Sequence, residues 1–317
     1  MVKLAKLVNT LVSIVDVSWI QYFSLTSSKS RSTNNENNHK RETFITFMNS
    51  WNENDFNDPK YGQACLKHVV SFNKAQKQIC PSYATYKITK KAGRKYNYDF
   101  DISYTDSTNQ VIQTSKIEFK FNANTIESLP QFVSPMNPSK YLSQSFEEDW
   151  YNKYLVSLLH RYNLPVSDFD TYLKQIHGNE PECMKDAQLL YYQGCKKSSK
   201  YTKNPEFYNE CIRLSKECIT NFISNTELNI ELLTEYLVDS QKEKIYLLYK
   251  DEEYQVQYMN PDDYTIVSYV KDPQGSRYIA TTKSNKQIRI LLRWKNGNGI
   301  AYPAFQISAN KKIKTSK

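Results

Sequence analysis

Two adjacent stretches of this sequence carry acidic and basic side chains in a pattern that could perform chemistry. Asp99 and Asp101 share one face of the alternating stretch YNYDFDISY, and Glu118 and Lys120 share one face of the next, KIEFKFNA. If TDSTNQ between them forms a turn, the stretches pair as a hairpin and the four side chains converge. Either aspartate can be paired with Glu118, so the alternation leaves the register open.

Three carboxylates beside one lysine are poorly suited to a plain solvent-exposed face. Like charges placed opposite each other destabilise a strand pair, and one lysine cannot neutralise three acids. Mg²⁺ takes oxygen ligands, commonly one or two carboxylates with waters and a substrate phosphate oxygen. We therefore expect Asp99, Asp101 and Glu118 to bind a metal ion and Lys120 to orient or deprotonate a water. The alternative is a simple ion pair facing solvent.

The elements that must position these residues can be read from periodicity. A short helix is expected at ETFITFMNSW and a second helix from Pro59 onward, where His68 falls on an apolar face and is interpreted as a core or boundary residue rather than a ligand. Three strands follow, then a long helix that begins with a Ser145–Glu148 capping box. The order predicts an α/β or α+β fold with a mixed sheet.

The hairpin residues and their context resemble the PD-(D/E)XK nuclease superfamily, which includes restriction endonucleases and many repair and phage nucleases. An aspartate followed by Glu118-Phe119-Lys120 on the next strand is similar to its motif, over roughly residues 57–160. No proline precedes either aspartate, which leaves open whether Asp99 or Asp101 is used. The resemblance implies a restriction-endonuclease-like αβββα core and Mg²⁺-dependent phosphodiester hydrolysis. Mn²⁺ is expected to be able to replace Mg²⁺. A helix-borne Glu or Gln often completes such sites, and the candidates are Glu42, Glu53 and Gln131.

We expect four parts along the chain. Residues 1–40 form an apolar N-terminal helix and a polar linker, and residues 41–170 form the nuclease core. Residues 171–240 form a helical insertion, and residues 241–317 form a β-rich part packed on the core.

The net charge of +9 in 317 residues favours a polyanionic partner, with nucleic acid first and an anionic membrane surface second. Basic residues concentrate just before the acidic strand and beside Trp294, and each group could contact DNA phosphates. The alternatives are a solvated hairpin edge for the first group and a turn with a core tryptophan for the second. The candidate DNA-binding residues are Lys90, Lys91, Arg94, Lys95, Arg293 and Lys295.

The six cysteines include no Cys-x-x-Cys pair, which argues against a structural zinc site. We expect free buried thiols and an intracellular protein. Asp16 interrupts the apolar N-terminal segment, so a membrane span is disfavoured. The alternative is a secretory signal followed by a protein with three disulfides.

These observations predict a Mg²⁺-dependent deoxyribonuclease, an endonuclease in preference to an exonuclease, with DNA as partner and no small-molecule cofactor. A homodimer is compatible with this prediction. The rival interpretations are a non-catalytic nucleic-acid-binding protein on a nuclease-like scaffold and a secreted disulfide-bonded protein.

Overall fold

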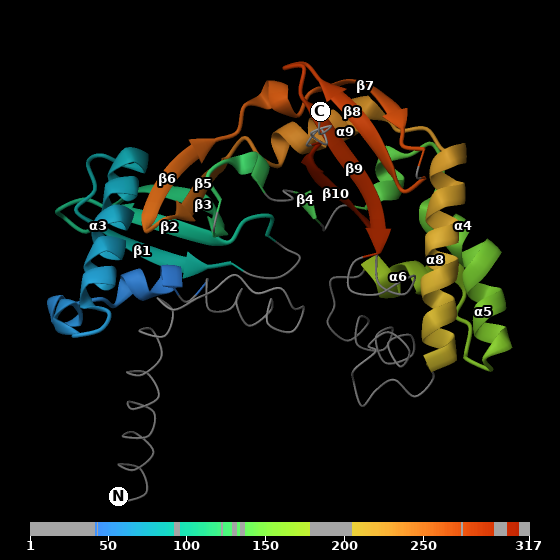
Figure 1. Ribbon diagram of the computed structural model, residues 1–317, viewed down its shortest axis with the longest axis horizontal. Coiled ribbons are helices and arrows are strands. Elements are labelled where there is room, and N and C mark those ends of the chain that lie inside the picture. Colours follow the sequence, from blue (N-terminus) through green and yellow to red (C-terminus); the bar gives the residue numbers. More distant parts are fainter. Residues whose placement is uncertain are drawn as a thin grey trace, which may run out of the picture. The chain divides into compact units, whose positions relative to one another are not determined.

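A computed structural model describes residues 42, 44–91, 96–121, 123–128, 132–133, 137–177, 205–273, 275–294 and 303–310. The chain has a mixed α/β fold that divides into two compact units (Figure 1). The first unit contains Met1–Ile126 and Glu243–Met259, and the second contains Glu127–Lys242 and Asn260–Lys317. This division differs from the four expected parts, because the first two strands after residue 242 join the sheet of the first unit.

The first unit is built on a five-stranded mixed sheet with the order β1-β2-β3-β5-β6. The pairing of β3 with β5 is parallel and the other three pairings are antiparallel. The expected meander of three strands is confirmed, although β2 begins at Phe100 rather than at Tyr96. The strands are β1 (Thr85–Lys90), β2 (Phe100–Thr105), β3 (Val111–Phe121), β5 (Lys244–Lys250) and β6 (Glu253–Tyr258).

One face of this sheet is covered by helix α3 (Gly62–Ile79), as Figure 1 shows. Alternate strand residues such as Phe100, Ile102 and Ile117 are fully buried in the same cluster as Phe72 of α3. A short helical segment at residues 44–46, with η2 (Phe47–Asn49) and η3 (Glu53–Asn57), precedes α3. The opposite face is therefore the one that carries the polar residues of the strands.

Helix α3 starts three residues later than the proline at position 59 suggests. The Oδ1 atom of Asp58 accepts hydrogen bonds from the backbone N–H groups of Lys60 and Tyr61, at 2.9 and 2.7 Å. A Cβ atom at Gly62 would lie 2.2 Å from the carbonyl oxygen of Phe56. The first turn therefore requires both the Asp58 side chain and a glycine, a combination that proline statistics do not reveal.

The second unit is built on an antiparallel sheet with the order β4-β10-β9-β8-β7. The three strands expected in this part of the chain are confirmed as β7, β8 and β9, and β10 is an addition that the periodicity did not identify. The strands are β4 (Phe132–Val133), β7 (Ile266–Lys271), β8 (Arg277–Thr282), β9 (Gln287–Trp294) and β10 (Pro303–Ala309).

Helices of the second unit cover part of its apolar core. Trp294 is 6% exposed and its ring centroid lies 5.2 Å from that of Phe146 and 5.5 Å from that of Trp150. The alternative interpretation of this segment, in which the tryptophan belongs to the core, is confirmed for Trp294. The helices are η4 (Ile126–Ser128, at the unit boundary), η5 (Pro138–Tyr141), α4 (Phe146–Trp150), the π-helical turn η6 (Tyr151–Leu155), α5 (Val156–Arg161), α6 (Phe169–His177), α8 (Pro205–Asn225), α9 (Ile230–Asp239) and η7 (Pro261–Asp263).

Cys65, Cys80 and Cys218 are buried free thiols, as expected. This contradicts the alternative with three disulfides, which would need all six cysteines. Cys183 and Cys195 lie outside the described residues, as does the N-terminal segment 1–40. Where the structure describes the chain, no helix is both long and apolar enough to cross a membrane. The described cysteines are Cys65, Cys80, Cys211 and Cys218.

The buried His68 generates a prediction about acid stability. Its side chain lies in the aromatic core, 1% exposed, and its Nδ1 atom is 3.2 Å from the hydroxyl of Tyr254. Burial lowers the pKa of His68 to about 3. The unfolded chain therefore binds the extra proton first, and the stability that neutral His68 contributes is lost as pH falls below about 6.5.

We predict that His68→Phe makes the free energy of unfolding less dependent on pH. Between about pH 7 and pH 5 it should fall by roughly 2 kcal/mol less than in the unsubstituted protein. Urea unfolding at both pH values measures the difference. The matched control is Tyr254→Phe, which removes the hydrogen bond but keeps the histidine and its pH dependence. An identical pH dependence in His68→Phe and the unsubstituted protein would contradict the prediction.

Candidate functional site

The register of the β2–β3 hairpin decides which aspartate lies beside Glu118. Asp101 pairs with Lys116 and Phe100 with Ile117, while the N–H of Asp99 donates to the carbonyl of Ile117 at 2.9 Å. The turn is closed by Asp106, whose Oδ1 accepts from two backbone N–H groups of the same turn. Asp99 is therefore the aspartate that is adjacent to Glu118.

Asp99 is held in a partly buried position just before β2. Its Oδ2 atom accepts a hydrogen bond from the N–H of Phe119 at 2.8 Å. Burial, and next the negative charge of Glu118, raise the pKa of Asp99 to about 7, although Lys120 and the Phe119 hydrogen bond act in the opposite direction. Glu42 adds a smaller repulsion. Asp99 and Glu118 are thus close enough to repel each other when both are ionised.

Glu118 lies between two lysines. The Nζ atom of Lys120 donates to Oε1 of Glu118 at 2.5 Å, and the Nζ atom of Lys244 lies 3.6 Å from Oε2. The side chains of Glu118 and Lys120 are only 11% and 13% exposed. The close contact of Glu118 and Lys120, two residues apart on one strand face, agrees with the expected pairing and differs from a freely solvated ion pair.

Lys244 is a component of the site that the sequence analysis missed. It is the first residue of β5, pairs with Lys116 in the parallel register, and has a side chain only 3% exposed. Burial lowers the pKa of Lys244, and the charge of Glu118 opposes this effect. A lysine at the start of a strand is ordinarily a solvated residue, so only its position beside Glu118 distinguishes it.

Asp101 lies on the same sheet face as the other three residues, but it lies opposite Lys116 and pairs with Lys91 rather than with Glu118. Its Oδ2 atom lies 2.9 Å from Nζ of Lys91, and its hydrogen bond with Tyr98 helps to raise the pKa of that tyrosine. The sequence predicted three carboxylates beside one lysine, whereas the cluster around Glu118 has two carboxylates and two lysines. Asp99 and Glu118 stand with Lys120 and Lys244, because the parallel strand contributes the second cation.

The basic residues named from the sequence have separate surroundings. Lys90 is ion-paired with Glu42, and Lys91 lies 5.1 Å from the ring centroid of Tyr96 in addition to its pairing with Asp101. Arg293, in the second unit, donates from Nη1 to Oε1 of Gln306 at 2.6 Å. The remaining candidates lie outside the described residues, namely Arg94, Lys95, Gln131 and Lys295.

The donor set can be tested for its fit to a metal ion. Where the structure describes side chains, no cluster of three or more His, Cys, Asp or Glu residues is placed to hold a metal ion. Asp99 and Glu118 supply two carboxylates, and Mg²⁺ commonly takes one or two from the protein, with waters and substrate oxygens completing its coordination. A divalent cation would also relieve the repulsion that raises the pKa of Asp99. The residues therefore fit Mg²⁺ bound together with a phosphate.

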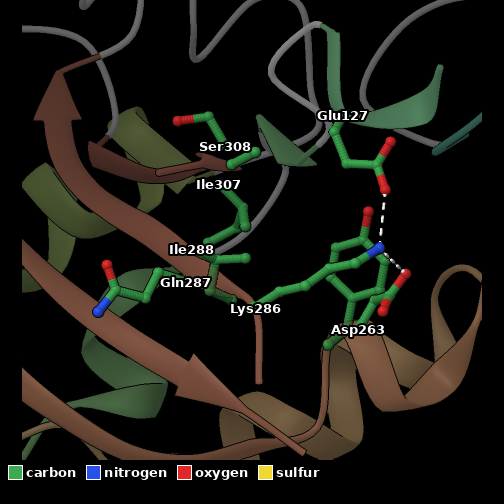
Figure 2. Close-up of a pocket in the computed structure, with 9 residues that line it drawn as sticks. Glu127, Asp263, Lys286, Gln287, Ile288, Ile307 and Ser308 are labelled. Carbon is green, nitrogen blue, oxygen red and sulfur yellow. Dashed lines mark hydrogen bonds and ion pairs between the residues drawn. The ribbon is translucent and has the colours of Figure 1, made fainter. Parts of the chain in front are cut away.

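A separate small cavity lies in the second unit, beside the turn between β8 and β9 (Figure 2). Lys286 reaches across it and contacts Oε1 of Glu127 at 3.0 Å and Oδ2 of Asp263 at 2.8 Å. The cavity volume of about 30 Å³ corresponds to a single water molecule. The lysine pairs with one oxygen of each carboxylate and so joins three segments of the chain.

Comparison with known proteins gives no assignment for this chain. No protein-family model matches it, and no curated protein matches it either.

The raised pKa of Asp99 predicts a pH-dependent cost of stability in the absence of divalent ions. Because the folded-state pKa is above the unfolded value, the protonated carboxyl stabilises the fold in acid, and this contribution is lost as pH rises through about 7. Asp99→Asn keeps an acceptor for the Phe119 N–H without the charge. In EDTA we expect this variant to gain stability over the unsubstituted protein as pH rises from about 5 to about 8, by on the order of 1 kcal/mol or more. Urea unfolding measures it, and equal pH dependence in the two proteins would contradict it.

Proposed function

We propose that this protein is a metal-dependent nuclease that hydrolyses DNA phosphodiester bonds. Asp99 and Glu118 would bind Mg²⁺, and Lys120 would orient the attacking water. One observation carries the proposal. Asp99 and Glu118 repel each other at the junction of two strands, and Lys120 donates to Glu118 at 2.5 Å from the same strand. Buried acids whose pKa values are shifted by a charged neighbour are typical of functional sites. The net charge of +9 supports a polyanionic substrate.

The element order supports the same proposal at the level of the fold. Helix α3 followed by the meander β1-β2-β3 agrees with the first four elements of a restriction-endonuclease-like αβββα core. The helix that follows the lysine strand is α4, which belongs to the second unit. We therefore propose a core of this type, in which the remaining strands of the sheet are supplied by β5 and β6.

The residues have distinct roles in the proposed reaction. Oδ2 of Asp99 accepts the hydrogen bond of the Phe119 N–H, and the carboxylates of Asp99 and Glu118 would hold the cation. When bound, Mg²⁺ would polarise the phosphate and stabilise the charge that develops on its oxygens. Lys120 lies beside both carboxylates, where its ammonium can donate a hydrogen bond to the attacking water and orient it.

A second candidate is nucleic-acid binding without catalysis. The observation that favours it is the charge balance around Glu118, which already has Lys120 and Lys244 as partners. Such a cluster could serve a structural purpose alone. Divalent-ion dependence separates the two candidates, since only the nuclease requires a cation for its activity.

The nuclease proposal predicts that plasmid and linear DNA are cleaved in Mg²⁺ and remain intact in EDTA. Glu118→Ala and Lys120→Ala should each lower the cleavage rate at saturating DNA by about a hundredfold or more, while thermal unfolding shows that the fold remains. Lys116→Ala is the matched control. Its side chain lies on the same sheet face, is ion-paired with Glu243 and is 43% exposed. Near-normal turnover by either site variant would remove the proposal.

The two aspartates are predicted to differ sharply. Asp99→Asn should abolish cleavage and also the stabilisation of the protein by Mg²⁺ in thermal unfolding, because Asp99 is adjacent to Glu118. Asp101→Asn should leave both within about threefold of their ordinary values, since its carboxylate pairs with Lys91. Equal effects of the two substitutions would show that the hairpin register does not select the metal ligand.

A further inference from the structure

Lys244 is unusual among the described lysines because its side chain is buried, with 3% exposed. It lies on the sheet face opposite α3, where Glu118 and Lys120 of the neighbouring strand also project. Removing an ammonium from water costs several kcal/mol unless it gains strong partners. A lysine retained at such a position needs a physical reason.

The contact that Lys244 makes is a loose one. Its Nζ atom lies 3.6 Å from Oε2 of Glu118, whereas Lys120 lies 2.5 Å from Oε1. Charge-assisted N–H···O hydrogen bonds are typically about 2.7–2.9 Å long. Glu118 is therefore held firmly through one oxygen by Lys120, and its second oxygen only weakly offsets the burial of Lys244.

The weakly held oxygen is also the one that Glu118 can offer to a cation. A metal ion held by Glu118 would offset the negative charge that lies nearest to the ammonium of Lys244. An anion must then replace it, and the anion that enters together with Mg²⁺ at such a site is a phosphate oxygen of the substrate. The second carboxylate, Asp99, contributes a smaller attraction to Lys244.

We propose that Lys244 contacts a phosphate oxygen of the bound DNA. While the site holds neither metal ion nor DNA, the ammonium of Lys244 offsets the negative charge of Glu118 in place of the metal ion. This assignment rests on the proposed nuclease function. It gives Lys244 a role different from that of Lys120, which orients the water.

Two effects of opposite direction follow. Without DNA, the ammonium of Lys244 competes with the cation for Glu118, so its removal should tighten metal binding. With DNA, the same substitution removes one phosphate contact and should weaken binding. A lysine that only stabilised the fold would also repel the cation, but its removal would leave the salt dependence of DNA binding unchanged.

The test compares Lys244→Met with Lys67→Met, which removes an exposed lysine of α3, the helix on the other face of the sheet. Isothermal titration calorimetry of the metal ion alone should give a Mg²⁺ Kd about threefold or more lower for Lys244→Met. Binding of a DNA duplex of about 20 base pairs in Ca²⁺ should weaken about tenfold. The slope of log K against log salt should fall by about 0.9, as for one lost phosphate contact. The metal affinity of Lys67→Met should be unchanged.

Two further variants keep the test decisive. Lys244→Arg retains the charge and should restore the salt slope, and Lys244→Gln replaces Lys244→Met if thermal unfolding shows that the latter does not fold. An unchanged salt slope in a folded, uncharged variant overturns the assignment of Lys244 to a phosphate contact, whatever its metal affinity. If the unsubstituted protein cleaves DNA in Mg²⁺, a failed Lys244 test overturns only the assignment of Lys244 and leaves the proposed nuclease function intact. If the unsubstituted protein neither binds nor cleaves DNA, the proposed function and the assignment both fall.

Discussion

The parallel pairing of β3 with β5 is the interaction on which the first unit depends. It joins segments far apart in the chain, as the contact between Lys116 and Glu243, 127 residues apart, illustrates. Parallel strands cannot be connected by a tight turn and require a long crossover. Here the chain leaves after β3, contributes helices and strand β4 to the second unit, and returns at β5. The same pairing completes the apolar face against α3 and delivers Lys244 to Glu118.

The polar cluster on the other face of this sheet is an electrostatic compromise. Lys120 and Lys244 offset the charge of Glu118, while Asp99 remains an acid whose ionised form is disfavoured by burial and by Glu118. Buried ion pairs contribute little net stability, because desolvation consumes most of the attraction between the charges. An apolar set of residues would serve a sheet better. Asp99, a buried acid whose pKa is raised by burial and by Glu118, has the features that are typical of functional sites.

The two sheets differ in how their strands find each other. In the second unit β7, β8 and β9 are consecutive antiparallel neighbours, and β10 follows β9, so their pairing needs only local connections. Their alternation, such as Ile290 and Leu292 buried on one face of β9, was evident from periodicity. In the first unit, the local meander β1-β2-β3 pairs through β3 with the β5–β6 hairpin, which comes much later in the chain. Domain boundaries placed by sequence order therefore divided a single sheet between two parts.

The sequence by itself determined the local features of this protein. The period of two placed Glu118 and Lys120 on one face of a strand, and the helical period placed His68 in the core. Tertiary structure decided the rest. Asp99 rather than Asp101 lies beside Glu118 because register depends on the turn and on the whole ladder, and a shift by one residue would have reversed every side chain. Lys244 entered the site because a parallel strand, distant in sequence, pairs with β3, and periodicity within a segment carries no information about its neighbours in space.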